Sequence, residues 1–366
     1  MNALMGTPYL LIDGAKMERN IHRMAAVAGR ARVNLRPHVK THKVPLIAEK
    51  QLEAGAVGIT VAKVSEAEVM VDAGIRDIFI AYPVVTEPQV RQALELSREV
   101  DLTVGVDSLE GAERLSEAAK EAGVSLDVRL EADTGLRRTG VPYDDAVEVA
   151  RRVDRLQNLN LTGIYTYRGA VLGGSKTLDL KAAGEEEGSL MVSLAERMRE
   201  QGLEIRDVSV GSTPTAEYVA AVEGVTEIRP GTYVFYDRMQ DRLGACSIED
   251  CAATIVASVV SRPHKDVAIV DGGSKTFATD VSPDEPPINL SGYGQVVGSP
   301  EITLQSLWEE HGRLAVSGEH DLGVDDRVQI IPNHICSTVN LHNEVYLLNE
   351  DADIQALRVA ARGKAR

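Results

Sequence analysis

Eight consecutive residues near the N-terminus, Arg36-Pro-His-Val-Lys-Thr-His-Lys43, carry side chains suited to covalent chemistry. Lys40 lies in a polar turn after a short apolar run, and His38 and His42 lie two positions from it on either side. Burial at the end of a strand favours the neutral, nucleophilic form of a lysine amine. An enzyme that forms a Schiff base requires such an amine. The alternative interpretation is a solvated turn with ordinary positive charges.

A second group of residues combines glycine with hydroxyl side chains in two short segments, Gly211-Ser-Thr-Pro-Thr215 and Arg229-Pro-Gly-Thr-Tyr233. Glycine lets the backbone approach a ligand closely, and N–H groups before a helix bind phosphate. A helix is predicted to begin near Thr215. The predicted phosphate donors are Ser212, Thr213, Gly231 and Thr232. Taken singly, each segment is equally compatible with an ordinary turn.

A third pair, His334 and Cys336, lies two positions apart in a segment rich in β-branched residues. Alternate residues of a strand project from the same face, so the two side chains are predicted to point together. Imidazole and thiolate favour zinc or another borderline divalent metal. Two protein ligands would leave coordination positions for water or substrate. The alternative is a core cysteine next to a turn histidine.

The elements that would position these residues alternate regularly between about residue 15 and residue 232. Apolar residues of the first intervening segment, Met17, Ile21, Met24 and Val27, fall on one face of a helix. The predicted strands are 33–36, 58–61, 78–81, 102–106, 126–131, 161–167, 207–210 and 226–229. Eight such βα units are typical of a (β/α)8 TIM-type barrel of α/β class. A doubly wound sheet is the alternative, and the lack of a glycine-rich dinucleotide fingerprint weakens it.

Beyond residue 245 the rhythm changes to short strands joined by glycine- and proline-rich turns, which predicts a mostly antiparallel β domain. Residues 8–13 form a further β-rich run that we expect to pair with this domain. The predicted domains are therefore a barrel over 14–245 and a β domain over 1–13 plus 246–366 that carries the metal pair. Predicted strands in it are 252–260, 267–270, 296–297, 328–331 and 344–348.

In a barrel, functional residues follow the strands at their carboxyl ends, and phosphate is commonly bound after strands seven and eight. The two glycine-containing segments follow those strands, and Lys40 follows the first. A lysine and a phosphate site in these places are typical of a pyridoxal 5'-phosphate (PLP) enzyme.

The chain resembles the D-threonine aldolase and D-serine dehydratase family of fold-type III PLP enzymes, relatives of alanine racemase. The resemblance rests on the three segments above together with Asp271-Gly-Gly-Ser-Lys275 and Pro332-Asn-His-Ile-Cys336, in the family's order along nearly the whole chain. The lysine motif differs from that of true alanine racemases, Val-Lys-Ala-Asn-Ala-Tyr-Gly.

This resemblance implies a Schiff base at Lys40, with Arg138, Tyr165 and Tyr167 near the cofactor ring and its 3-oxygen. It implies PLP phosphate on the donors named above, and a divalent metal (Zn, Mn or Mg) on His334 and Cys336, because family members carry a His-x-Asp or His-x-Cys pair at this place. It also implies a homodimer with the site near its interface.

By the same resemblance the chain is a lyase of D-3-hydroxy amino acids. The overall sequence pattern favours D-threonine aldolase, which yields glycine and acetaldehyde. The cysteine in the metal pair favours the alternative, a D-serine or 3-hydroxy-D-aspartate dehydratase that yields a 2-oxo acid and ammonia. A racemase would need a second base opposite Lys40, and the sequence identifies none. A non-catalytic PLP carrier is the remaining alternative, which the large C-terminal region disfavours.

Composition limits the other function classes. The net charge of −16 over 366 residues argues against a nucleic-acid surface and against adsorption to anionic membranes. No apolar run approaches the roughly 20 residues of a membrane span, and the N-terminal residues lack a signal-peptide pattern. Three cysteines cannot form a disulfide framework. We therefore expect a cytoplasmic protein whose partner is a small D-amino acid.

Overall fold

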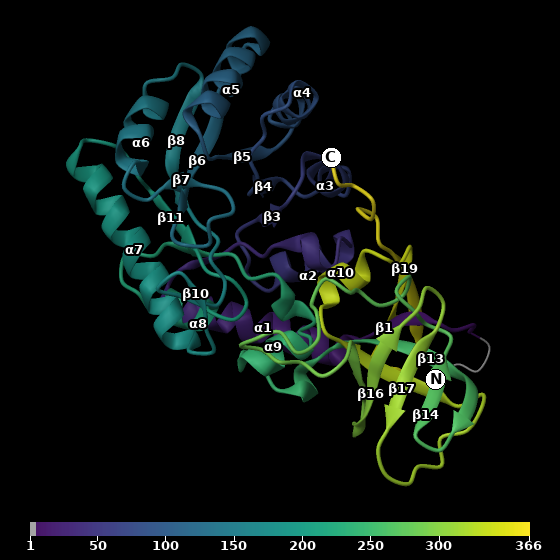
Figure 1. The fold of residues 1–366 in the computed structure, drawn as a ribbon. Coiled ribbons are helices and arrows are strands. Elements are labelled where there is room, and N and C mark those ends of the chain that lie inside the picture. Colours follow the sequence, from purple (N-terminus) through teal and green to yellow (C-terminus); the bar gives the residue numbers. More distant parts are fainter. Residues whose placement is uncertain (1–4) are drawn as a thin grey trace. The chain divides into compact units, whose positions relative to one another are not determined.

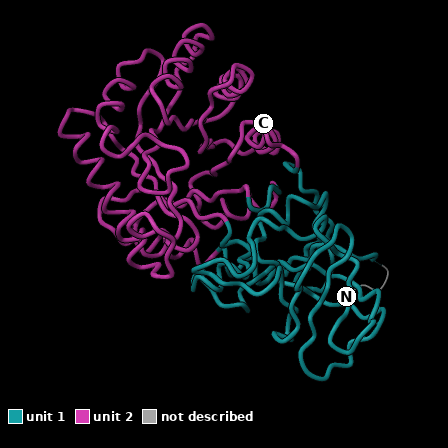
Figure 2. The backbone as a smooth tube through the Cα atoms, in the orientation of Figure 1, with its two compact units in different colours: residues 1–21, 41–44, 232–362 teal, residues 22–40, 45–231, 363–366 magenta. Residues whose placement is uncertain are grey.

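The structure, a computed structural model, describes residues 5–366 and divides into two compact units (Figure 2). Unit 1 comprises residues 1–21, 41–44 and 232–362, and unit 2 comprises residues 22–40, 45–231 and 363–366. Lys40 is thus the last residue of its segment in unit 2, and Thr41 is the first of the next segment in unit 1.

Unit 2 is built on eight parallel strands among the described residues, ordered β2-β12-β11-β8-β6-β5-β4-β3. A parallel bridge between His38 and Thr60 joins the two ends of this order, so the sheet closes into a barrel. The predicted TIM-type barrel is confirmed. Its strands are β2 (Asn34–Leu35), β3 (Ile59–Val61), β4 (Asp77–Ile80), β5 (Asp101–Val106), β6 (Leu126–Asp133), β8 (Leu159–Tyr165), β11 (Asp207–Val210) and β12 (Glu227–Ile228).

Helices surround the strands of this barrel (Figure 1). In α5, Ser108 caps the first turn by accepting the Gly111 N–H at 3.2 Å, and Gly123 ends the helix with φ 67°. The helices are α2 (Pro45–Glu53), α3 (Val64–Asp72), α4 (Glu87–Leu96), α5 (Leu109–Ala122), α6 (Ala146–Asp154), α7 (Leu180–Glu200) and α8 (Ala216–Ala220). Three two-residue strands lie in its loops, β7 (Val141–Pro142), β9 (Val171–Leu172) and β10 (Ser175–Lys176).

The barrel interior holds an ionic network as well as aliphatic side chains. Arg36 Nε donates to Glu227 Oε2 at 2.8 Å, and Arg129 Nη1 donates to Glu227 Oε1 at 2.5 Å. Arg129 also pairs with Asp207, and Arg36 with Asp77. Burial opposes ionisation of Glu227, but the adjacent Arg129 and Arg36 hold its pKa at about 2. The network therefore joins the first, fifth and last strands of the barrel through one buried carboxylate.

Unit 1 contains a sheet ordered β14-β17-β16-β15-β18-β13-β1-β19-β20, in which β13 also pairs with β14. That additional pairing closes the first six strands on themselves. As predicted, the N-terminal run joins this domain: β1 is antiparallel to β13 and parallel to β19. The strands are β1 (Tyr9–Asp13), β13 (Ala253–His264), β14 (Val267–Val270), β15 (Gly294–Val296), β16 (Ser299–Leu307), β17 (Gly312–Val316), β18 (Arg327–Pro332), β19 (Glu344–Leu348) and β20 (Ile354–Arg358).

Strands β16, β17 and β20 were not predicted from the sequence. In β16 and β20 most side chains are at least partly exposed, so the apolar run that marks a buried strand is missing. Unit 1 also holds two short helices, α9 (Arg238–Leu243) and α10 (Ile335–Val339), while α1 (Gly14–Ala31) contributes residues to both units.

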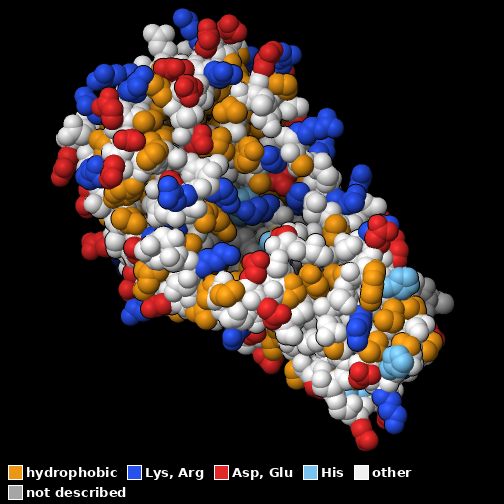
Figure 3. All heavy atoms as spheres, in the orientation of Figure 1, with side chains coloured by type: hydrophobic (Ala, Val, Ile, Leu, Met, Phe, Trp, Pro, Cys, Tyr) orange, Lys and Arg blue, Asp and Glu red, His pale blue; other side chains and the backbone are white. Residues whose placement is uncertain are grey.

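The protein surface carries charges of both signs. Acidic and basic side chains are interspersed on the face shown in Figure 3. Among the described residues, every helix is too short or too polar to cross a membrane. The three cysteines are free thiols.

Candidate active site

Lys40 lies in a single 3-10 turn, Val39–Thr41, directly after β2. The His38 N–H donates to the Pro230 carbonyl at 2.9 Å, which fixes the backbone before the turn to the segment after the eighth strand. Lys40 Nζ is 5.4 Å from the centre of the Tyr167 ring, and the Arg138 guanidinium is 4.8 Å from the same ring. The structure therefore brings three of the sequence-predicted residues together.

His38 lies next to this group as a neutral imidazole. Burial, together with the positive charges of Lys40, Arg229 and Arg138, holds its pKa well below the ordinary value. Its buried Nδ1 has no hydrogen-bond partner in the structure. A neutral ring at this place adds no further positive charge beside the lysine amine.

Tyr165 lies apart from that group, inside the barrel. Its ring packs edge-on against Phe79, with centroids 5.0 Å apart, and its hydroxyl donates to Glu131 Oε2 at 3.1 Å. Burial and the Glu131 carboxylate raise the pKa of Tyr165 well above its ordinary value. The predicted strand ran to Tyr167, but β8 ends at Tyr165. The earlier tyrosine therefore packs within the barrel, while the later one is 37% exposed.

The two predicted phosphate loops are joined by a hydrogen bond, because the Gly231 N–H donates to Thr213 Oγ1 at 3.2 Å. Within the first loop the Ser212 N–H donates to Thr215 Oγ1 at 3.3 Å. Gly211 has φ 83°, and a Cβ there would lie 2.7 Å from Val219 Cγ1, so only glycine fits. Ser212, Thr213 and Gly231 are thus gathered in one place, with a donor set suited to a phosphate.

Thr232 belongs to a different set of contacts. It begins a short 3-10 turn, Thr232–Val234, and its Oγ1 lies 3.4 Å from Cys336 Sγ. Thr41 Oγ1 lies 3.2 Å from the same sulfur. The residue after Lys40 and the residue after Gly231 therefore both contact the cysteine of the predicted metal pair.

His334 and Cys336 are not on a strand, which corrects the prediction. β18 ends at Pro332, and His334 is the N-cap residue of α10. Asp237 Oδ2 accepts the Ile335 N–H at 2.9 Å, and Thr338 Oγ1 donates to the His334 carbonyl at 2.8 Å. These contacts with a distant carboxylate and a following threonine stabilise a helical turn where the local composition predicts a strand.

The ring of His334 is oriented by a carboxylate. His334 Nδ1 bonds Asp280 Oδ2 at 2.7 Å, and Ser337 Oγ donates to the same oxygen at 2.7 Å. With Nδ1 engaged as a donor, Nε2 keeps the lone pair that a metal requires. Asp280 was missed by the sequence analysis, because it lies 54 positions from His334 and no local pattern connects them.

The thiol and the imidazole form a coupled pair. Burial opposes ionisation of Cys336, but His334, Thr232 and Thr41 hold the pKa of its thiol below the ordinary value. Burial opposes the charged form of His334, whereas Cys336 and Asp280 raise its pKa well above the ordinary value. A divalent cation would replace the proton that this pair shares. Within residues 5–366 no cluster of three or more His, Cys, Asp or Glu side chains is arranged for a metal. His334 and Cys336 remain the predicted pair of ligands.

Replacing Asp280 with asparagine is expected to weaken divalent-metal binding by about 10–100-fold, because the ring of His334 loses its carboxylate partner. Isothermal titration of the metal-stripped protein with Zn²⁺ measures this. Asp266→Asn, on an exposed turn in the same unit, is the matched control. Equal affinities for the two variants would contradict the orienting role of Asp280.

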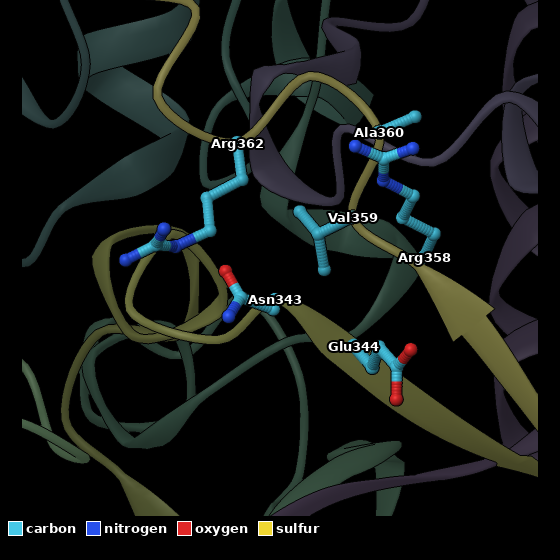
Figure 4. Close-up of a pocket in the computed structure, with 6 residues that line it drawn as sticks. All are labelled: Asn343, Glu344, Arg358, Val359, Ala360 and Arg362. Atoms are coloured by element: carbon cyan, nitrogen blue, oxygen red, sulfur yellow. The ribbon is translucent and has the colours of Figure 1, made fainter.

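A separate pocket of about 450 Å³ lies in unit 1 (Figure 4). Glu344 and Arg358, which are paired in register on β19 and β20, line it together with Asn343 and Arg362. None of the predicted site residues lines this pocket.

Comparison with known proteins places these observations in a family. Residues 12–239 match the family model of the alanine racemase N-terminal domain, and residues 252–348 match that of a putative serine dehydratase domain. D-threo-3-hydroxyaspartate dehydratase of Delftia sp. is 35% identical, with 96% of each chain covered. D-threonine aldolase of Arthrobacter sp. is 32% identical over 100% of this chain and 94% of the relative. D-serine dehydratase of Dictyostelium discoideum is 27% identical over 96% of this chain and 95% of the relative.

The solved structure of the Delftia dehydratase superposes with a TM-score of 0.89 and covers 97% of both chains. That enzyme has also been solved as two variants, one with a histidine replaced by alanine and one with a cysteine replaced. The two positions are two residues apart, and the cysteine variant is described as metal-free.

Proposed function

Because the chain belongs to the family of PLP-dependent lyases that join an alanine-racemase-type barrel to a serine-dehydratase domain, we propose that it is a metal-dependent dehydratase of D-3-hydroxy amino acids. The observation that carries this proposal is the His334–Cys336 pair, with Asp280 fixing the histidine ring. A histidine and a cysteine at the same spacing were the positions replaced in the Delftia dehydratase.

The cofactor, the metal and the residues of this chain have separate roles in the proposed reaction. PLP, when bound, supplies an electron sink for negative charge at the substrate Cα, and a divalent metal, when bound, supplies a Lewis acid for the β-hydroxyl. Ser212, Thr213 and Gly231 would bind the phosphate of the cofactor. Lys40 would hold the cofactor and remove the Cα proton. The β-hydroxyl would leave as water, and a water molecule would be consumed when ammonia is released, so the 2-oxo acid and ammonia together account for all atoms of the substrate.

Chain connectivity links the lysine to the metal pair. Thr41 is bonded to Lys40 through one peptide bond, and its hydroxyl contacts Cys336 Sγ at 3.2 Å. Thr232 is the next residue after Gly231, and its hydroxyl contacts the Sγ of Cys336 at 3.4 Å. We propose that Lys40 and the metal pair both take part in the reaction.

A second candidate reaction is aldol cleavage, supported by the D-threonine aldolase of Arthrobacter sp., which matches the entire chain. In that reaction the β-hydroxyl loses its proton and the Cα–Cβ bond breaks, so D-threonine yields glycine and acetaldehyde. The same residues would bind the substrate and the cofactor in both reactions. The homodimer remains a prediction.

Proton NMR of D-threonine and D-threo-3-hydroxyaspartate, each incubated with protein loaded with PLP and metal, distinguishes the reactions. We expect 2-oxobutyrate from D-threonine and oxaloacetate from the hydroxyaspartate, with L-threonine unreactive. Prior treatment with a chelator should abolish turnover, and added Zn²⁺ or Mn²⁺ should restore it. Glycine as the product would establish the aldolase, and no turnover at all would contradict both candidates.

A further inference from the structure

A buried carboxylate that the sequence analysis did not identify lies behind the first phosphate loop. Glu187, on α7, has no exposed surface. Its Oε1 accepts the Gly211 N–H at 3.2 Å, and its Oε2 accepts the Thr215 hydroxyl at 3.3 Å. Those two residues are the first and last of the loop, so one side chain fixes both ends of the segment that holds Ser212 and Thr213.

Close packing of α7 against α8 puts Glu187 in this position (Figure 1). A Cβ at Gly184 would lie 2.8 Å from the Tyr218 Cβ, and one at Gly188 would lie 2.8 Å from Val222 Cγ2. The two glycines, one helical turn apart, thus let the helix backbone approach the loop closely. Close packing of the helices thus holds the backbone that carries Glu187 next to the loop.

The charged groups that face Glu187 from neighbouring elements are Arg229, after β12, and Arg168, after β8. Each arginine has other partners: Arg229 donates to Ser209 Oγ and to the Thr166 carbonyl, and Arg168 pairs with Glu186. Burial raises the pKa of Glu187 to about 7, against the lowering effect of the Gly211 N–H and of Arg229. The carboxyl group is therefore protonated more readily near neutral pH than an ordinary glutamate.

An ionised Glu187 and a phosphate dianion would be like charges on opposite sides of one short loop in a desolvated region. Like charges in such a place raise the pKa of the weaker acid. We propose that Glu187 takes up a proton when the loop binds the cofactor phosphate, so that the affinity for PLP falls as Glu187 ionises. This inference rests on the proposed function, which supplies the cofactor.

The coupling between proton uptake by Glu187 and PLP binding sets how strongly the PLP affinity depends on pH. Coupling to one proton weakens PLP binding by at most about tenfold for each pH unit above neutrality. At pH 7 the wild-type chain should take up more protons on binding PLP, by up to about one, than a variant that lacks the carboxyl group. Glu187→Gln removes the ionisable group and keeps an oxygen acceptor for the Gly211 N–H.

The test is calorimetric titration of the full, cofactor-stripped chain with PLP at pH 7, in buffers of different ionisation enthalpy, with pyridoxal as the probe that lacks phosphate. Wild type should show the extra proton uptake with PLP and not with pyridoxal, and Glu187→Gln should lose it. Glu185→Gln, an exposed position on the same helix, is the matched control and should behave as wild type.

Equal proton uptake by wild type and Glu187→Gln would overturn this inference and leave the proposed function standing. No PLP binding by wild type would overturn both. If Glu187→Gln does not fold, the difference between PLP and pyridoxal on the wild-type chain decides, because both probes condense with the same lysine. Phosphate that binds as the dianion releases protons, since its second pKa is about 6. Greater proton uptake with PLP than with pyridoxal therefore supports protonation of Glu187, and equal or smaller uptake overturns it.

Discussion

Lys40→Ala is expected to abolish covalent attachment of PLP and to reduce turnover to background. Reduction of the loaded wild-type protein with borohydride should add the mass of one reduced cofactor, and the variant should add none. The reason is chemical, because only an amine can form the Schiff base. Lys40 also has the position this bond requires, after the first strand and beside Tyr167 and Arg138.

Two further variants make the lysine experiment specific. Lys50→Ala, on α2, removes a lysine of the same unit from a helix, and its mass increment should equal that of wild type. Lys40→Arg keeps the positive charge and should also fail to bind the cofactor covalently. A borohydride-fixed cofactor in Lys40→Ala would show that another amine carries it.

Cys336→Ala is expected to lower divalent-metal affinity by more than the roughly 10–100-fold expected for an outer-shell partner such as Asp280. Cys336 is one of the two predicted metal ligands, and its thiol has a pKa below the ordinary value beside His334, so its loss would remove half of the predicted ligand set. Metal content after dialysis and dehydration of D-threonine should fall together. The thermal unfolding midpoint should change little, because the barrel does not depend on this side chain.

Cys246→Ala is the control for the metal experiment, since Cys246 is a free, half-buried thiol apart from the pair. It should retain both metal and activity. If Cys336→Ala kept its metal content and its activity, the assignment of His334 and Cys336 as ligands would be wrong.

The barrel could be predicted from the sequence because most of its strands contain a short apolar run and are followed by a segment of helical period. The predicted strands then placed Lys40 and the two glycine-containing loops at the functional end of the barrel, since the functional residues of a barrel lie after its strands. The helical turn at His334 could not be predicted, because the carboxylate that stabilises it, Asp237, is 98 positions away. Asp280 and Glu187 were missed for the same reason: each acts through a partner that only the fold brings near.

The buried ionic network has a consequence for how the chain is made. Arg36 is synthesised 191 positions before Glu227, the carboxylate that it shares with Arg129. A chain that ends before the eighth strand holds these two arginines in the barrel interior with only Asp77 and Asp207 as counter-charges. Because a buried ion pair is destabilised when one partner is missing, the absence of Glu227 disfavours the closed barrel. Ribosome-bound intermediates should therefore lack a closed barrel, and its closure should await the emergence of the last strand.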